Sequence, residues 1–195
     1  MSIAFDHAPR SGVASLAGNP RPDSRTLHTA SRPEDLSSDR FRAVFRQHPA
    51  GVAVVTFADG ERPIGFTATS VISVSAEPPL LAFSIAGTSS SWPVLVVAPS
   101  VVINFLTAEQ VDVSVRFATG GIDRFAGADW QRLPTGEPVL DGALSWVRGE
   151  VVQRTSVGAS HLVVVRAVDS SQGPQVAPLV YYDRAYHQVD DSSAL

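Results

Sequence analysis

The segment from Gly65 to Pro79, GFTATSVISVSAEPP, carries residue types that suit the binding of a flat polar ligand. Even-numbered positions from 66 to 74 are mostly apolar, and odd-numbered positions from 67 to 75 are nearly all Ser or Thr. This period of two predicts a strand with one face in a core and one face of small hydroxyls. Because so long a strand seldom stays flat, we expect a bend or bulge near Thr69–Ser70, where a ligand can approach the backbone. The alternative is an ordinary solvated face of a sheet.

Two further clusters are suited to binding an anion. The hydroxyls of Thr88–Ser91 directly precede a helix expected over residues 91–97, and helix N-termini carry unpaired N–H groups and partial positive charge. Arg116 and Phe117 close a second helix, expected over residues 108–117, and a guanidinium can bind a phosphate bidentately. Each cluster also has a simpler explanation, which is N-capping for the serines and an ordinary C-terminal cation for Arg116.

The last candidates lie toward the C-terminus. His161 begins an apolar strand, and Tyr181–Tyr186 brings aromatic and charged groups together; a core-edge histidine and a plain turn are the alternatives. The five histidines show neither His-x-His nor i, i+4 spacing, so we expect no metal site. A Gly-x-Ser-x-Gly motif is absent from the sequence, and no acid is obviously placed to form a nucleophilic triad with His161.

Composition excludes several kinds of chemistry. The 195 residues include no Cys, and all fifteen cationic side chains are Arg. Thiol nucleophiles, lysine Schiff bases and Walker-type phosphate loops are therefore excluded, and any anionic ligand must be held by Arg, hydroxyls or backbone N–H groups. A net charge of −4 with scattered Arg argues against a nucleic-acid partner. No apolar run approaches a membrane span and no segment has the character of a secretion signal, so we expect no membrane association and a cytoplasmic location.

Patterning along the chain predicts a mainly β domain. Residues 1–38 have four prolines among Ser, Thr, Gly, Asp and Arg and few large apolar residues, so they are expected to form a flexible arm. A domain over 39–190 and a tail over 191–195 are expected to follow. A short helix is expected from Asp39 to the residue before Pro49. Strands are expected over 51–57, 64–75, 80–86, 101–106, 144–152, 161–168, 179–182 and 186–189. Because these strands do not alternate with helices, a closed antiparallel barrel is favoured over a doubly wound sheet.

In this order, the segments resemble the short-chain flavin reductase family. The residues that carry the resemblance are FRAVFRQHPAGVAVVT (41–56), GFTATSVISVSAEPPL (65–80), TSSSW (88–92), VINFL (102–106), VSVRFA (113–118), DRFAG (123–127), GEPVLDGAL (136–144) and LVYYDRAY (179–186). Members of this family are reductase components of two-component flavin-dependent monooxygenases, and the NADH:FMN oxidoreductase type is the most similar.

The resemblance implies a fold and a set of site residues. The fold is an antiparallel Greek-key split β-barrel of the FMN-binding type with a few short helices, usually a homodimer with flavin near the subunit interface. Residues expected to line the flavin ring are Pro63, Ile64, Gly65, Phe66, Thr67, Thr69, Ser70, Ser84, Ile85 and Ala86. Residues expected to hold the phosphate end are Ser90, Ser91, Arg116 and Phe117. Those expected to face the nicotinamide nucleotide are Tyr181, Tyr182, Asp183 and Arg184, together with His161.

Two catalytic roles follow from the same resemblance. Thr69, at the expected bend, is the residue we expect nearest to flavin N5, and His161 is the second candidate. The family usually has Asp before this histidine and Gly five residues after it, whereas this chain has Ser160 and Arg166. Ser160 cannot anchor a histidine by charge as an Asp does, which weakens the role of His161.

The implied activity is hydride transfer from NADH or NADPH to FMN, with FAD possible, and delivery of reduced flavin to a separate monooxygenase. One alternative is a flavoprotein with tightly bound FMN that acts on its own small substrate. Another is a non-catalytic flavin-binding module. For the 2′-phosphate of NADPH, the sequence offers Arg154, Arg166 and Arg184 as candidate cations, and the choice of nucleotide stays open.

Overall fold

The computed structural model describes residues 35–189 and 191–193, and the elements named below lie in one compact unit, Ser37–Leu195. Most of the arm expected over residues 1–38, and part of the tail expected over 191–195, lie outside the described residues. The division into arm, domain and tail therefore stays a prediction. In the described part of the chain, no helix has both the length and the apolar character needed to cross a membrane.

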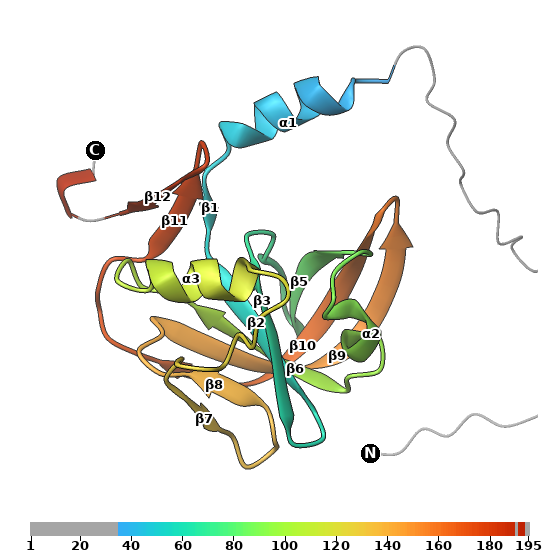
Figure 1. The fold of residues 1–195 in the computed structure, drawn as a ribbon, viewed down its shortest axis with the longest axis vertical. Helices are drawn as coiled ribbons and strands as arrows, with labels where there is room; N and C mark the ends of the chain where they lie inside the picture. Colours follow the sequence, from blue (N-terminus) through green and yellow to red (C-terminus); the bar gives the residue numbers. More distant parts are fainter. Residues whose placement is uncertain (1–34, 190, 194–195) are drawn as a thin grey trace, which may run out of the picture. The chain divides into compact units, whose positions relative to one another are not determined.

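Seven antiparallel strands form the main sheet, in the order β3-β2-β6-β9-β10-β5-β4 (Figure 1). Their bounds are β2 (Ala53–Asp59), β3 (Arg62–Ala68), β4 (Ile72–Ala76), β5 (Pro79–Ala86), β6 (Ser100–Phe105), β9 (Ser145–Val157) and β10 (Ser160–Gln172). Large side chains such as Phe57, Phe83 and Ile103 are fully buried between the strands. Because β3 also contacts β5 near the other end of the order, the sheet curls into a barrel. The mainly β, antiparallel class expected from the sequence is confirmed.

The long strand expected over residues 64–75 is interrupted at Thr69–Ser70, where a bend or bulge was expected. Residues 69–71 leave the ladder, and the halves on either side, β3 and β4, pair at opposite ends of the sheet order (Figure 1). The expected core face is right for β3, where Phe66 and Ala68 are buried, and wrong for β4. Ile72 is 57 % exposed and Val74 is 52 % exposed, because the odd-numbered side of the chain faces the core after the interruption and Val71 packs there instead.

Two short helices and a small hairpin cover the barrel. Helix α2 (Trp92–Leu95) is shorter than expected, and α3 (Val111–Ala118) begins three residues later than expected because Gln110 rather than Thr107 precedes its first turn. Helix α3 packs on β2 and β3 around a second buried cluster, which includes Val54, Leu106 and Phe117. The hairpin of β7 (Trp130–Arg132) and β8 (Pro138–Leu140) was not expected from the sequence.

A separate three-stranded sheet carries the first helix. Strands β1 (Ala50–Gly51), β11 (Leu179–Tyr182) and β12 (Ala185–Gln188) pair in the order β1-β11-β12, and a short 3₁₀ turn, η1 (Asp191–Ser193), follows. Helix α1 (Ser38–Arg46) begins at the cap residue Ser37, whose hydroxyl accepts a hydrogen bond from the Arg40 N–H. Figure 1 shows α1 projecting away from the barrel, and none of its residues is buried.

Candidate functional site

The first part of the site is a pocket beside the start of β3. This anion pocket has a volume of about 570 Å³ and is lined by Pro63, Ile64 and Gly65 of β3, by Ser90 and Ser91, and by the loop over residues 121–126. The serines lie directly before α2, so the fold brings β3 and the Ser-rich segment together, as the resemblance implied. A volume in this range is typical of small-molecule sites.

Arg62 and Arg124 both line the anion pocket, but Arg62 forms an ion pair with Asp59 at 2.6 Å, whereas Arg124 has other partners. Its Nη1 atom donates to the Gly65 carbonyl oxygen at 2.8 Å and to Ser91 Oγ at 3.2 Å, and its Nε donates to the Thr119 carbonyl oxygen at 2.8 Å. Burial lowers the pKa of this guanidinium. Within the described residues Arg124 has no carboxylate partner. A partly desolvated cation that contacts only neutral oxygens is suited to an incoming phosphate.

Arg116, which the sequence singled out for this role, lies elsewhere. It occupies the last turn of α3, and its Nη1 donates to the Ala126 carbonyl oxygen at 2.5 Å. It is not among the residues that line the anion pocket. Arg116 therefore supports the loop that carries Arg124. Arg124 stands in the DRFAG motif, but no spacing rule in the sequence separates it from fourteen other arginines.

Phe117 lies behind β3 and is fully buried. A Cβ atom added at Gly65 would lie 2.7 Å from Cε1 of Phe117, so a side chain at position 65 would collide with the ring. The close approach of strand and helix explains why the strand has Gly here. Phe117 therefore supports the strand from behind.

The second part of the site is a narrow pocket of about 250 Å³ between β3 and β5, called here the ring pocket. Its lining residues are Phe66, Thr67, Ser84, Ile85, Ala86, Ser89, Phe117, Ala118 and Arg124. It shares Arg124 with the anion pocket, so the two pockets adjoin. Of the residues expected to line the flavin ring, those from β5 and the later part of β3 therefore line this pocket, and Pro63, Ile64 and Gly65 line the adjoining anion pocket. The Thr67 hydroxyl is already engaged, because it donates to the Ser114 carbonyl oxygen of α3 at 2.6 Å.

The third part is a pocket of about 720 Å³ below α1, called here the α1 pocket. It is lined by Thr69, Ser70, Ile72, Ser84, Tyr181, Tyr182, Asp183, Arg184 and Ala50, and by Phe41, Arg42, Phe45, Arg46 and His48 of α1 and the residues after it. Ser84 lines this pocket and the ring pocket, so the sequence-predicted residues form a continuous row. The involvement of α1 was not expected from the sequence.

Ser70 fixes the interruption between β3 and β4. Its hydroxyl oxygen accepts a hydrogen bond from the Ser84 N–H at 2.9 Å and lies 3.2 Å from the Ser84 carbonyl oxygen, to which it donates. These bonds replace the strand ladder where the backbone of residues 69–71 turns away from β5. Thr69, the neighbouring residue, is exposed, and no side-chain hydrogen bond is found for it within the described residues.

His161 is not brought to the α1 pocket. It pairs with Ile85 across the β10–β5 ladder, and its ring stacks on Trp92 with centroids 3.6 Å apart and planes 7° apart. Its Nδ1 lies 3.2 Å from Ser156 Oγ. Within one chain His161 is thus separate from Tyr181–Arg184, and its catalytic role stays a prediction. In the described part of the chain, no group of His, Asp or Glu side chains is placed to bind a metal ion.

Of the three cations considered for a 2′-phosphate, the fold brings only Arg184 to the α1 pocket. Arg154 donates to the Leu95 and Ala98 carbonyl oxygens at the end of α2, and burial lowers its pKa. Arg166 forms an ion pair with Glu150 at 2.5 Å. Both are therefore engaged in structural contacts.

Comparison with known proteins agrees with this geometry. The family described as "Flavin reductase like domain" matches residues 45–190. An NADH:FMN oxidoreductase of Rhodococcus qingshengii is 42 % identical over 86 % of this chain and 95 % of that protein. The reductase subunit HsaB of a flavin-dependent monooxygenase from Mycobacterium tuberculosis is 35 % identical over 77 % of this chain and 81 % of that protein.

A crystal structure of a flavin reductase domain protein from Arthrobacter sp. FB24 has a TM-score of 0.75 and 36 % sequence identity, over 78 % of this chain and 95 % of that one. The split-barrel class expected from the sequence is thereby confirmed. The chain therefore belongs to the flavin reductase like family and is a flavin oxidoreductase, as the resemblance implied.

Proposed function

We propose that the protein is an NADH:FMN oxidoreductase that passes reduced flavin to a separate monooxygenase. The names of two relatives support this choice, since one is an NADH:FMN oxidoreductase and the other a reductase subunit of a flavin-dependent monooxygenase. FMN rather than FAD, and NADH rather than NADPH, are part of the proposal. A homodimer in the cytoplasm completes it, because the unburied helix α1 needs a partner surface and NADH is a coenzyme of that compartment.

The observation that carries the proposal is the anion pocket with its desolvated Arg124. A phosphate monoester placed there would meet Arg124 and the hydroxyls of Ser90 and Ser91. The adjoining ring pocket then receives the tricyclic ring against β3 and β5, where small side chains permit close contact. The row of residues fits a molecule with one charged end and one flat end.

The α1 pocket lies at the other end of this row and would receive the nicotinamide nucleotide. A flavin bound along β3 and β5 and a nicotinamide nucleotide bound in the α1 pocket would supply the redox chemistry, which is transfer of a hydride from the nucleotide to the flavin. The protein needs no general acid for this step, because hydride carries its own proton and electron pair. Its contribution is to hold the two reacting atoms about 3–3.5 Å apart and to exclude water.

Within this arrangement, the interruption between β3 and β4 holds the residues nearest to the reaction. Ser70 is fixed by Ser84, which lines both the ring pocket and the α1 pocket, and the neighbouring Thr69 lines the α1 pocket. The free hydroxyl of Thr69 can donate to the polar edge of the ring, where charge increases during transfer.

Steady-state oxidation of NADH with FMN as the only acceptor tests the proposal. Because released reduced FMN is reoxidised by dissolved oxygen, we expect continuous NADH consumption, with turnover on the order of 1–10³ s⁻¹. A single reduction of bound flavin without continued turnover would instead indicate a flavoprotein with its own substrate. Binding of FMN without any NADH oxidation would indicate a non-catalytic module and would contradict the proposal.

A further inference from the structure

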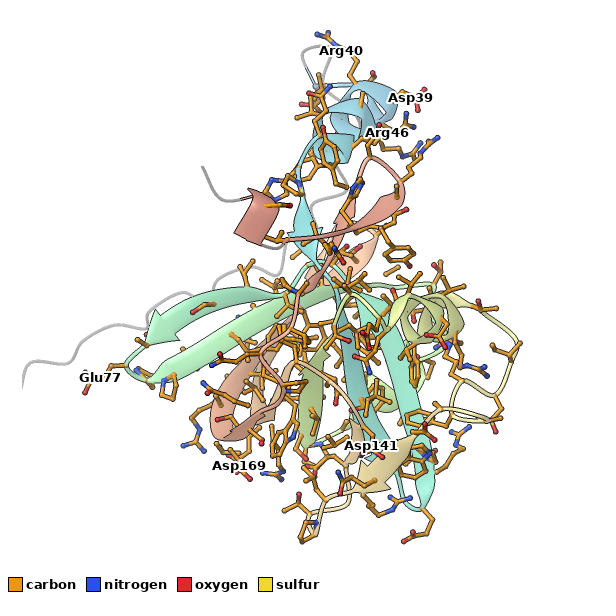
Figure 2. All side chains as sticks on the ribbon, turned by 90° about the vertical axis from the view of Figure 1, so that its left-hand side faces the viewer. Asp39, Arg40, Arg46, Glu77, Asp141 and Asp169 are labelled. Carbon is orange, nitrogen blue, oxygen red and sulfur yellow. The ribbon has the colours of Figure 1, made fainter. Side chains whose placement is uncertain are left out.

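The cations of α1 have no role in the function proposed so far. Arg42 and Arg46 line the α1 pocket together with Arg184 of the β11–β12 turn. Figure 2 shows Asp39 and Arg40 at the far end of α1 and Arg46 at the end nearer the strands. Helix α1 therefore presents its cations unequally, with Arg42 and Arg46 at the pocket and Arg40 away from it.

We propose that α1 forms one wall of the nucleotide site, and that Arg46 and Arg184, assisted by Arg42, bind the pyrophosphate of the nicotinamide nucleotide. This inference rests on the proposed function and adds the group that recognises the charged part of the hydride donor. Recognition of the pyrophosphate is thereby assigned to α1, which lies outside the barrel. The α1 pocket is at the opposite end of the row of pockets from Arg124.

A backbone hydrogen bond holds the two elements in place. The Asp183 N–H donates to the Arg46 carbonyl oxygen at 3.0 Å, so the β11–β12 turn is attached to the last turn of α1. Asp183 and Arg184 have φ angles of 44° and 67°, which are the left-handed values of a tight hairpin turn. Arg46 and Arg184 are thus brought near each other by a fixed contact, although they are far apart in the sequence.

The charges at the pocket are unbalanced. Among the described lining residues, Asp183 has the one carboxylate, against the guanidinium groups of Arg42, Arg46 and Arg184. In the described part of the chain, neither Arg46 nor Arg184 forms an ion pair or a side-chain hydrogen bond. Arg42 contacts Asp39 at 3.3 Å, but both side chains are largely exposed, and such a pair contributes little.

The simpler explanation for Arg46 is a cation at a helix C-terminus, where the helix dipole is negative. That dipole corresponds to roughly half an elementary charge, which is less than the three guanidinium groups supply. Several carbonyl groups at this end are also engaged, since those of Val44, Phe45 and Arg46 accept backbone hydrogen bonds. The surplus positive charge is therefore not explained by the helix end alone.

The remaining lining suits the uncharged parts of a dinucleotide. Phe41 and Phe45 of α1 and Tyr181 and Tyr182 of β11 provide aromatic surface for a base. At about 720 Å³ the pocket is the most spacious of the three that form the row. A dinucleotide with its nicotinamide at Thr69 and its pyrophosphate at Arg46 and Arg184 would use both the polar and the cationic parts.

Binding of ADP-ribose to the FMN-saturated protein tests the inference without relying on catalysis. ADP-ribose carries the pyrophosphate but no nicotinamide, and its affinity can be measured by isothermal titration calorimetry. We expect Arg46→Gln and Arg184→Gln each to weaken binding about tenfold, because each removes a charge-assisted contact. Arg40→Gln is the matched control: it removes the same charge from the same helix, away from the pocket, and we expect less than about a twofold change.

Titration with 2′-phospho-ADP-ribose distinguishes the pyrophosphate from the 2′-phosphate of NADPH. If the arginines bind the pyrophosphate, the two probes lose affinity equally in each variant. A loss confined to the 2′-phosphorylated probe would assign the cations to nucleotide selectivity and overturn the pyrophosphate assignment. Unchanged affinity in Arg46→Gln and Arg184→Gln, an equal loss in Arg40→Gln, or no binding of ADP-ribose to the wild type would each overturn the inference.

Kinetics separates this inference from the proposed function. In the flavin reduction assay, we expect both variants to raise KM for NADH about tenfold, with kcat and KM for FMN within about twofold of wild type. If the wild type oxidised NADH with FMN and both variants kept the wild-type KM for NADH, the inference would be contradicted and the proposed function would remain supported. A wild-type protein that does not oxidise NADH would contradict both.

Discussion

Arg124 and Arg116 lie close in the chain but differ in what their guanidinium groups can still bind. Arg116 is directed at a loop carbonyl, whereas Arg124 lies at the anion pocket with neutral partners only. A guanidinium that is partly desolvated and has no carboxylate partner is a stronger phosphate ligand than one that serves a loop. The residue types alone do not show this difference.

We therefore expect Arg124→Gln to weaken FMN binding about tenfold and Arg116→Gln to change it by less than about threefold. Riboflavin, which lacks the phosphate, provides the control, because a specific phosphate contact should not alter its affinity. Fluorescence titration with FMN and riboflavin measures both constants. If Arg124→Gln weakened the two flavins equally, the residue would support the loop rather than bind phosphate.

Glu137 is a buried acid with a structural task. Its side chain is almost fully buried and accepts hydrogen bonds from Ser100, Thr135 and Arg148, with Arg148 Nη2 at 2.9 Å. Burial raises the pKa of this carboxyl, but the hydrogen bonds from Arg148, Ser100 and Thr135 outweigh it and lower the pKa from 4.5 to about 2. The carboxylate thereby attaches the β7–β8 hairpin to β6 and β9.

A lowered pKa makes this contribution pH-dependent. At a pH above the pKa that Glu137 has in the unfolded chain, the carboxylate contributes its full stabilisation of about 3 kcal/mol. This contribution is lost as the pH falls from about 5 to about 2. We expect urea unfolding to show this loss in the wild type and a flatter pH profile in Glu137→Gln. Glu150→Gln, which alters a half-exposed ion pair, should follow the wild-type profile. Parallel profiles for wild type and Glu137→Gln would show that Glu137 does not supply the effect.

At the scale of elements, the interruption between β3 and β4 is the feature that joins fold and chemistry. It separates β3, at one end of the sheet order, from β4, at the other end, and it places Thr69 at the α1 pocket. The neighbouring hydroxyls of Thr67 and Ser70 are engaged with Ser114 and Ser84. Among Thr67, Thr69 and Ser70, Thr69 therefore has the hydroxyl that is available to a ligand within the described residues.

We expect Thr69→Ala to lower kcat by about tenfold or more and to leave KM for FMN within about twofold. A donor at the reacting edge stabilises the transition state more than the bound flavin. Ser73→Ala, which removes an exposed hydroxyl from β4, is the control and should leave both constants unchanged. Turnover equal to wild type in Thr69→Ala would remove Thr69 from the catalytic residues.

Much of this element structure was predictable, and the exceptions share a cause. Alternating and continuous apolar runs predict β2, β5 and β6 closely, because the side chains of a strand report its burial directly. The change of face after residue 69 was not predictable, since it depends on the partner strand that β4 finds. The β7–β8 hairpin was missed because Glu137, a charged residue, anchors it.

The structure brings together the predicted residues on β3 and β5 and the two serines before α2, whereas His161 on β10 and Arg116 at the end of α3 do not line the three pockets of the row. The row on β3 and β5 follows from the alternation of small and apolar residues. Arg124 and α1 could not be chosen, because their positions depend on how the loop over 121–126 and the turn at Asp183 fold onto other elements. Such long-range placement leaves no local signal in the sequence.

At the scale of the whole molecule, helix α1 and strand β4 are among the elements that expose large apolar side chains. Helix α1 buries no residue, and Val44 on this helix is 63 % exposed, while Val74 on β4 is 52 % exposed. A helix this short is only marginally stable in water unless its apolar face is packed. Within the described residues the apolar face of α1 is not buried, and a second copy of the chain is the occupant that the proposed homodimer supplies.

Light scattering after size exclusion tests the homodimer. We expect the wild type to have a mass about twice the 20.7 kDa of one chain. For a Val44→Glu, Val74→Glu double variant we expect the mass of one chain, because each charge placed in an apolar interface would lose its solvation without gaining a partner. Neither valine lines the α1 pocket, so nucleotide contacts are not altered directly. Val97→Glu, at a valine that is 76 % exposed beyond α2, is the control and should stay dimeric. A wild-type mass of one chain at tens of micromolar would contradict the dimer, and a dimeric double variant would place the interface on other surfaces.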